Sequence, residues 1–315
     1  MYEKWKGVHT RCAFNMIQEL IPLTRPRTLA AALGPTILGA AFSYYAFGAA
    51  QGTGLAIFHT VLIFLAVVTA QIVANLWNEY KDFKSGLDAG QKVGNAGSIT
   101  RGVITPELII TMIKVLMFVP IIIGLYLSTT ITWYYIPVGF LCILISFLYS
   151  GGPKPISRTP FGEISSGIAM GFTIVLITGY AWIRELSLAL LIPAIPSTLL
   201  VGSIMLTNNI RDIRNDESHG RHTLPIVLGR ERALSLMSIS YIFNFIWIIA
   251  WIIIGHMTWF ALLAFLSAPL AFKTIHTLST NTDEFQLDKA MGTTAGAAMI
   301  YQLMWAIGLI MGKLF

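Results

Sequence analysis

The sequence has 315 residues, of which 55% are hydrophobic and only 11% are charged. Soluble domains carry roughly 25% charged residues, so this composition excludes a soluble globule and predicts a chain that lies mostly in lipid. We therefore interpret the net charge of +6 as a guide to membrane orientation rather than as a sign of nucleic-acid binding. The two cysteines, Cys12 and Cys142, are too few and too far apart to define a disulfide framework or a metal cluster.

Nine membrane-spanning helices are predicted from the stretches that carry almost no charge, since a helix needs roughly 20 apolar residues to cross a bilayer. In chain order these stretches have room for two helices in 28–78, two in 108–153, one in 164–183, one in 186–210, two in 233–272 and one in 290–312. The fold class is therefore all-α: a nine-helix bundle over residues 28–315. Residues 1–27 are too charged for a cleaved signal peptide and are expected to lie on the membrane surface.

The basic residues predict the orientation of this bundle. With the N-terminus inside, the inner segments are 1–27, 78–106, 151–160, 211–232 and 273–289. They hold 5, 4, 2, 5 and 2 Lys or Arg residues, 18 of the 21 in the chain. This bias predicts a cytoplasmic N-terminus and an outer C-terminus.

Two of the inner segments, 78–106 and 211–232, are long, and each is associated with an Asn-x-x-x-Asp pattern. Asn78 and Asp82 form the first pattern, and Asn208 and Asp212 form the second, which Asp216 extends. A four-residue step places side chains on one face of a helix. Four predicted helices separate the two patterns, so both lie on the same side of the membrane, and we expect them to converge on one cavity.

Acidic side chains at the membrane end of a helix are costly, and stacked acids repel one another, which indicates that cations bind between them. Oxygen ligands without a neighbouring His or Cys favour Mg²⁺, which typically completes its shell with substrate phosphates. Both segments are also rich in Lys and Arg, which suit phosphate oxygens.

Two alternatives compete with this interpretation. The charges could simply anchor the loops at the inner surface, although stacked acids do not serve that purpose. The acids could instead bind a translocated cation in a transporter. No acidic residue lies in the middle of a predicted span, which favours chemistry on an interfacial substrate over transport.

Four stretches of the sequence resemble motifs of the UbiA superfamily of intramembrane prenyltransferases, whose members have nine transmembrane helices. The stretches are Arg25-Pro26, NEYKDFKSGLD at 78–88, YSGGPKPISRTPFGEI at 149–164 and NNIRDIRNDESHGRHTLPIVLG at 208–229. The YSGGP segment is similar to the branch that prenylates 1,4-dihydroxy-2-naphthoate. The first motif departs from the usual superfamily pattern, because Glu79 follows Asn78 and Gly86 replaces the third Asp, with Asp88 two residues further on.

The resemblance implies an enzyme of the cell membrane with its active site facing the cytoplasm. The reaction would transfer a polyprenyl group from polyprenyl diphosphate to 1,4-dihydroxy-2-naphthoate with loss of CO₂ and diphosphate, giving demethylmenaquinol in menaquinone biosynthesis. Another aromatic acceptor, such as 4-hydroxybenzoate, homogentisate or a haem, is the nearest alternative. Prenyl chain length and oligomeric state do not follow from the sequence.

The resemblance also implies roles for individual residues. Two Mg²⁺ ions would be held by Asn78, Asp82, Asp88, Asp212 and Asp216, with Asp82 and Asp212 the principal catalytic ligands. The diphosphate would be bound by Lys84, Arg101, Lys154, Arg211 and Asn208.

Three further residues complete this set. Arg25 or Arg27 would bind the acceptor carboxylate, and Tyr149 would shield the allylic carbocation with its ring face. Membrane anchoring is the alternative for Arg27, and an interfacial aromatic belt is the alternative for Tyr149. The tryptophans Trp247, Trp251 and Trp305 are expected to be packing or lipid-facing residues.

Overall fold

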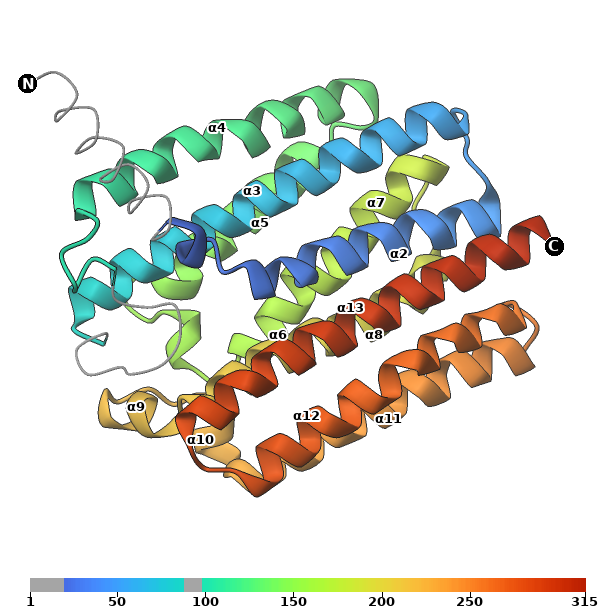
Figure 1. Cartoon of the computed structure of the whole chain (residues 1–315). Coiled ribbons are helices and arrows are strands. Elements are labelled where there is room, and N and C mark those ends of the chain that lie inside the picture. The colour runs from blue at the N-terminus through green and yellow to red at the C-terminus, as the bar shows by residue number, and fades with distance from the viewer. Residues whose placement is uncertain (1–19, 88–97) are drawn as a thin grey trace, which may run out of the picture.

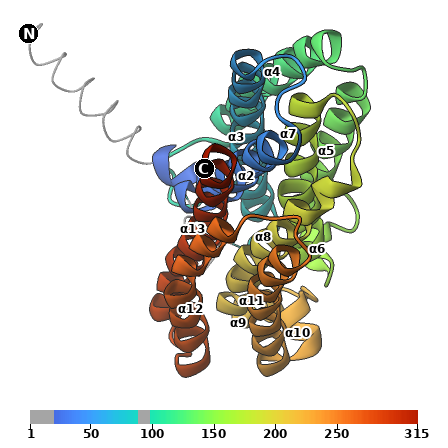
Figure 2. The same cartoon turned by 90° about the vertical axis from the view of Figure 1, so that its right-hand side faces the viewer.

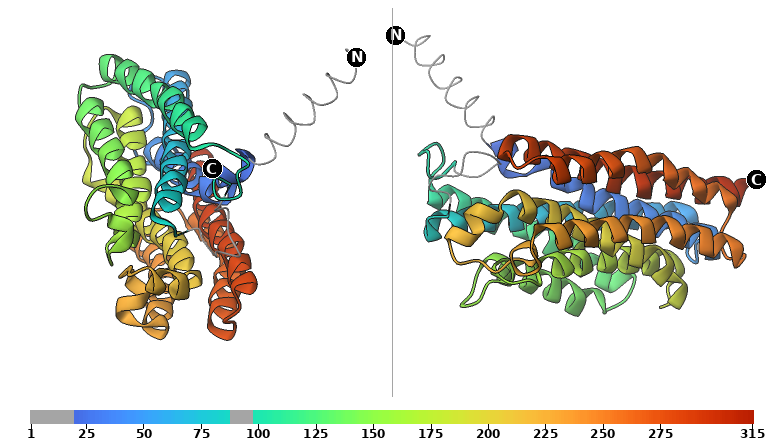
Figure 3. Two further views of the ribbon diagram at one scale, coloured as in Figure 1. Left: turned by 90° about the vertical axis from the view of Figure 1, so that its left-hand side faces the viewer. Right: turned by 90° about the horizontal axis from the view of Figure 1, so that it is seen from below.

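The chain forms a bundle of long helices that run side by side (Figures 1 and 3). The computed structural model describes residues 20–87 and 98–315, and every regular element in these ranges is helical. The principal elements are α2 (Ala30–Phe47), α3 (Thr53–Ser85), α4 (Pro106–Thr130), α5 (Tyr135–Ser150), α6 (Gly162–Ser166), α7 (Thr173–Ile183), α8 (Leu191–Arg211), α9 (Ile213–Ser218), α10 (Leu224–Leu228), α11 (Arg230–Ile253), α12 (Ala268–Thr280) and α13 (Glu284–Leu314).

Shorter helical pieces begin or join several of these helices. They are the 3₁₀ segments η1 (Pro26–Leu29), η2 (Ile156–Arg158), η4 (Leu188–Leu190) and η5 (Trp259–Ser267), and the π-helical segment η3 (Gly167–Phe172) between α6 and α7. Most of the predicted surface segment 1–27, and the predicted metal ligand Asp88, lie outside the described residues.

Seven helices of the described chain are long and apolar enough to cross a membrane. The first and fourth predicted spans correspond to shorter helices, α2 with 18 residues and α5 with 16. Many apolar side chains of α4 point outward, and Phe118 and Ile122 are each 63% exposed. Such a surface is compatible with lipid rather than with water.

The predicted inner loops are wrong in extent, because helices occupy much of them. Helix α3 continues to Ser85, so Asn78 and Asp82 are helical residues rather than loop residues. The segment 211–232 contains α9, α10 and the start of α11, and only residues 281–283 separate α12 from α13. Charge marks where a helix leaves the apolar layer, but the helix itself continues until its capping residue.

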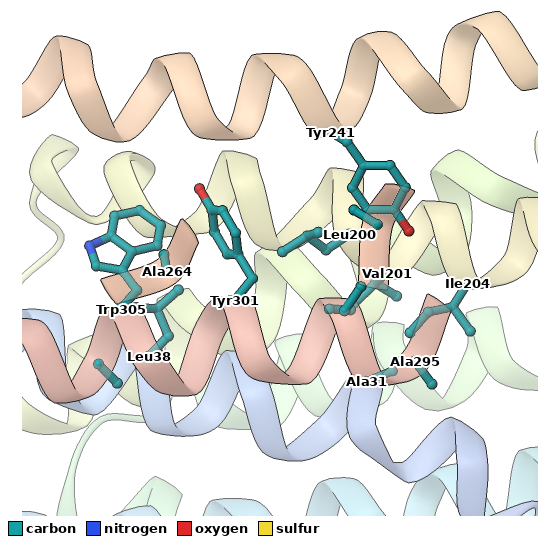
Figure 4. Close-up of a cluster of buried hydrophobic side chains, with 14 of the residues drawn as sticks. Ala31, Leu38, Leu200, Val201, Ile204, Tyr241, Ala264, Ala295, Tyr301 and Trp305 are labelled. Atoms are coloured by element: carbon teal, nitrogen blue, oxygen red, sulfur yellow. The ribbon is translucent and has the colours of Figure 1, made fainter. Parts of the chain in front are cut away.

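Helices α2, α8 and α13 contact one another and form the centre of the bundle. Figure 2 shows this centre end-on, with α4 and α5 on one side and α11 and α12 on the other. Trp305 and Tyr301 of α13 are fully buried against Leu38, Leu200 and Ala264, as Figure 4 shows. The Trp305 indole donates a hydrogen bond to Met257 Sδ at 3.2 Å, so Trp305 is a packing residue.

We predict that Trp305→Ala lowers the free energy of unfolding by about 3 kcal/mol, because it opens a cavity where a fully buried side chain packs in the core. Ile307→Ala in the same helix is the control, since Ile307 is 43% exposed and its removal leaves no internal void. Unfolding of the purified protein in mixed detergent micelles measures both values. Equal losses in the two variants would contradict the packing assigned to α13.

Candidate active site

The first acidic motif ends at a glycine turn that closes α3. Gly86 has φ +73, a value that favours glycine, and its N–H donates to the carbonyl of Phe83 at 3.1 Å. The N–H of Leu87 donates to the carbonyl of Asp82 at 3.1 Å. These two bonds define a Schellman motif. A glycine at the position of the usual third Asp therefore has a structural reason, because the chain reverses there.

The second acidic motif ends in the same way at α9. Gly220 has φ +67, and its N–H donates to the carbonyl of Glu217 at 3.1 Å. The N–H of Arg221 donates to the carbonyl of Asp216 at 3.0 Å. Asp216 thus holds the same position in this helix ending that Asp82 holds in α3. In both cases the acid lies in the last helical turn, where the helix dipole disfavours negative charge.

The two acids are brought together by one cation, Arg221. Its Nη2 atom lies 2.8 Å from Asp82 Oδ1, and its Nη1 atom lies 3.3 Å from Asp216 Oδ1. All three side chains are at most 13% exposed. Residues separated by 139 positions in the sequence therefore meet at one end of the bundle, where α9 and the carboxyl end of α3 lie (Figure 1).

A second arginine, Arg211, binds the remaining acid of the motif. Its Nε and Nη2 atoms donate to the two carboxylate oxygens of Asp212 at 2.8 and 2.7 Å. It also donates to Asp288 of α13 at 2.9 Å and to Asn208 at 2.9 Å. Arg211, expected to bind diphosphate, is thus fully engaged with acidic and amide oxygens in this structure.

The spacing of the second motif survives the break between α8 and α9. The N–H of Asp212 donates to the carbonyl of Asn208 at 3.1 Å, and the N–H of Asp216 donates to that of Asp212 at 2.8 Å. These are the bonds of a continuous α-helical pitch. The four-residue steps therefore stay on one face, as the sequence predicts.

Burial raises the pKa of Asp216 to about 7. The Arg221 guanidinium opposes this rise, and the neighbouring carboxylates of Asp212 and Asp82 add to it. The ion pairs place four aspartates on two arginines, so the cluster has an excess of negative charge. A further cation in this position is electrostatically favoured.

A cavity of about 170 Å³ adjoins this cluster, although none of the three aspartates is among the residues that line it. Four of the predicted site residues line it: Arg25, Asn78, Tyr149 and Asn208. Arg221 lines it as well. The side-chain oxygen of Asn78 accepts a hydrogen bond from Ser150 Oγ at 2.9 Å, which fixes α3 against α5 at the cavity wall.

Arg25 reaches this cavity from an unusual backbone conformation. Its φ is +50, a left-handed value that is uncommon for residues other than glycine and that costs about 1 kcal/mol or more. The following residues Pro26–Leu29 form η1 and lead into α2. Arg184 at the end of α7 has a similar φ of +62, so the place of Arg25 in the cavity lining, rather than its backbone, supports a role in the site.

The structure does not bring the other predicted basic residues into the cavity lining. Lys84 and Lys154 are exposed, with the Lys84 ammonium 5.2 Å from the centre of the Tyr80 ring. Arg101 is also exposed, and its Nη2 atom lies 3.3 Å from Ser98 Oγ. The side chain of Arg27, like Asp88, lies outside what the structure describes.

Two acidic residues near the site, Glu163 and Asp288, were not singled out from the sequence. Glu163 of α6 is buried and accepts a hydrogen bond at 2.8 Å from Asn209, which lines the cavity. Asp288 binds Arg211. Glu163 lies within the YSGGP stretch, whereas nothing in the local sequence distinguishes Asp288, because its role depends on where α13 packs.

The oxygen atoms of Asn78, Asp82, Asn208, Asp212 and Asp216 are a suitable donor set for a hard divalent cation. Within residues 20–87 and 98–315, however, no three acidic, His or Cys side chains are gathered closely enough to hold a metal ion. The reason is visible in the ion pairs, since Arg221 and Arg211 hold the three aspartates. The donor set fits a metal, but its acids are directed at guanidinium groups.

Comparison with known proteins identifies the family to which the chain belongs. The model of the UbiA prenyltransferase family matches residues 32–307. The chain belongs to the UbiA prenyltransferase family. A 1,4-dihydroxy-2-naphthoate octaprenyltransferase of Bacillus subtilis (strain 168) is 35% identical over 303 residues, which cover 94% of this chain and 93% of that protein. The predicted resemblance to the superfamily is thus confirmed.

Solved structures of UbiA proteins share the fold. A UbiA homologue from Aeropyrum pernix K1 in its apo form has a TM-score of 0.68 at 18% identity and covers 90% of this chain and 97% of its own. A UbiA homologue from Archaeoglobus fulgidus bound to GPP and Mg²⁺ has a TM-score of 0.62 at 16% identity, covering 93% and 99%. At these identities the likeness concerns the fold.

Proposed function

We propose that this UbiA-family protein transfers a polyprenyl group from polyprenyl diphosphate to 1,4-dihydroxy-2-naphthoate, releasing CO₂ and diphosphate and forming the demethylmenaquinol of menaquinone biosynthesis. The observation that carries the proposal is the meeting of Asp82 and Asp216 beside a cavity lined by Asn78, Asn208 and Arg25. The acceptor is inferred from the relative of Bacillus subtilis, whose name specifies dihydroxynaphthoate.

Magnesium is the metal proposed for this site, since a UbiA homologue of the same fold binds GPP together with Mg²⁺. Asn78 and Asp82 are assigned to one ion and Asp212 and Asp216 to a second, with Asp88 as a further ligand. Bound there, magnesium would neutralise the diphosphate and make it a better leaving group.

The protein's own side chains supply binding and orientation. Asn208, which lines the cavity, binds diphosphate oxygens. Arg25, held in the cavity wall, binds the acceptor carboxylate. Tyr149 also lines the cavity, and its aromatic ring can stabilise an allylic carbocation while the apolar walls exclude water.

The polyprenyl tail explains why the site lies at the end of a membrane bundle. Its tens of carbons belong in lipid, whereas the diphosphate needs cations and water-facing groups. We propose that α2 and α5 join the seven long apolar helices to make nine crossings, and that the site faces the cytoplasm. The concentration of Lys and Arg in the segments at the site's end supports this orientation.

The proposed function predicts both the product of the reaction and its dependence on a divalent metal. Purified protein in detergent with 1,4-dihydroxy-2-naphthoate, a polyprenyl diphosphate and Mg²⁺ is expected to form a prenylated, decarboxylated product that mass spectrometry identifies. EDTA abolishes the reaction, and Mg²⁺ or Mn²⁺ restores it, because oxygen ligands favour hard cations. A panel with 4-hydroxybenzoate and homogentisate tests the acceptor. Preference for either, or full activity in chelator, would refute this assignment.

Asp82→Asn is predicted to reduce turnover roughly a hundredfold at saturating Mg²⁺, because it removes a charge that acts as the C–O bond breaks. The asparagine oxygen still accepts from Arg221, so the free energy of unfolding changes by only about 1 kcal/mol. Glu217→Gln is the matched control, since Glu217 is an exposed acid of α9. Near-normal turnover of Asp82→Asn would remove Asp82 from the mechanism.

The orientation is tested by single cysteines in a chain that lacks Cys12 and Cys142. Ser85→Cys and Ser218→Cys, both exposed at the site's end, are expected to react only when a membrane-impermeant thiol reagent reaches the cytoplasmic face. Glu185→Cys, between α7 and α8, is expected to react from the outer face. Labelling of all three positions from one side would contradict the proposed topology.

A further inference from the structure

Arg221 lies between Asp82 and Asp216, two aspartates that the proposed function assigns to different metal ions. We propose that Arg221 is a positioning residue that acts as an internal counter-ion: it neutralises Asp82 and Asp216 in the ligand-free protein, and it transfers to the diphosphate when substrate binds. Divalent metal and diphosphate then bind together rather than independently. This inference rests on the proposed function, because it assumes a diphosphate substrate.

The ion pairs of Arg221 compete directly with metal binding. The same guanidinium contacts Asp82 Oδ1 at 2.8 Å and Asp216 Oδ1 at 3.3 Å. Each proposed ion needs aspartate oxygen atoms at about 2.0–2.1 Å, and a positive guanidinium in contact with those same oxygen atoms opposes its binding. Metal binding therefore requires the Arg221 side chain to leave at least one of the two aspartates.

The hydrogen bonding of Arg221 is incomplete. Its Nε atom is buried and has no acceptor among the described residues. Arg211, by contrast, uses its Nε and both Nη atoms in four hydrogen bonds to Asp212, Asp288 and Asn208. A guanidinium with a buried, unused donor gains bonds when an anion with several oxygens arrives. Arg221 therefore has a reason to move, and Arg211 does not.

Arg221 is also placed at the cavity where the head group would bind. It lines the same cavity as Asn78, Asn208 and Arg25, so a rotation of its side chain brings the guanidinium toward a bound head group. Its backbone stays fixed, because its N–H donates to Asp216 and the next residue, His222, donates to Arg158 at 3.0 Å. Only the side chain has to move.

This arrangement has a consequence for the order of binding. Without diphosphate, Mg²⁺ has to displace a cation from a partly buried ion pair, so its affinity is low. With diphosphate present, the displaced guanidinium finds new acceptors, and metal affinity rises. Coupling of this kind is reciprocal, so metal also strengthens diphosphate binding. The site therefore binds little metal while no substrate occupies the cavity.

The test measures metal binding without any prenyl substrate. Mn²⁺ is titrated into purified, detergent-solubilised protein, and the free ion is followed by electron paramagnetic resonance. Arg221→Gln is expected to bind Mn²⁺ about tenfold more tightly than wild type, because a competing charge within ion-pair distance is removed. Arg214→Gln removes the same charge from an exposed position of α9 and is expected to leave the affinity within about twofold, since exposed charges are screened by solvent. Equal or weaker Mn²⁺ binding by Arg221→Gln overturns the proposal.

Arg221→Lys keeps a charge but cannot bridge two carboxylates with a planar fork, and it decides the question if Arg221→Gln does not fold. Its Mn²⁺ affinity is expected between those of wild type and Arg221→Gln, and an affinity at or below wild type overturns the proposal. The melting temperature in chelator provides a second measurement, and it is expected to fall in Arg221→Gln and to recover with Mn²⁺. Because no acceptor or prenyl chain is present, the outcome is independent of whether dihydroxynaphthoate is the substrate.

Discussion

Negative charge at the carboxyl ends of helices is the constraint on which the site depends. Asp82 and Asp216 each lie in the last turn of a helix, where the backbone dipole already contributes partial negative charge. They are also largely removed from water. Such groups persist when positive charge is supplied from elsewhere in the fold, and Arg221 supplies it to both. The same electrostatic demand makes this end of the bundle a suitable place for a metal–diphosphate complex.

Polar contacts between several helices hold the site in place. Asn78 of α3 accepts from Ser150 of α5, and Asn209 of α8 donates to Glu163 of α6. Arg211 of α8 reaches Asp288 of α13. Each bond crosses between helices that are held mainly by packing of apolar side chains. The acids are therefore positioned by the whole bundle and not by the short turns that carry them.

The two arginines have different roles: Arg211 holds the structure together, and Arg221 takes part in the proposed function. Arg211 is saturated with partners and joins the end of α8 to the start of α13. Arg221 has an unused donor, lines the cavity and bridges motifs from two distant helices. A fully bonded cation stabilises one arrangement, whereas a partly bonded cation beside a cavity is ready for an exchange of partners. In the proposed reaction, that exchange would couple substrate binding to metal binding.

Properties of neighbouring residues were sufficient to predict that the protein lies in a membrane and approximately where its helices lie. They also predicted that the side chains of each aspartate motif share one helix face. Hydropathy and the four-residue step are properties of neighbouring residues, so they can be read along the chain. The motif stretches also identified the family. The end of α3 was predicted too early, because the first charged residues after the apolar stretch were taken as its boundary. The helix continues to Ser85 and ends at the Schellman turn of Gly86.

Tertiary structure alone decided which charges meet. Arg221 was one of many basic residues in the sequence, and Asp288 had no local signal, yet each holds an aspartate of the second motif directly or through Arg211. Lys84, Arg101 and Lys154 were equally basic, but they are exposed and do not line the cavity. The pairing of Arg221 with Asp82 spans 139 residues, and such a contact depends on how α3, α8 and α9 pack. No pattern confined to one helix encodes that packing, because it results from the shape complementarity of the whole bundle.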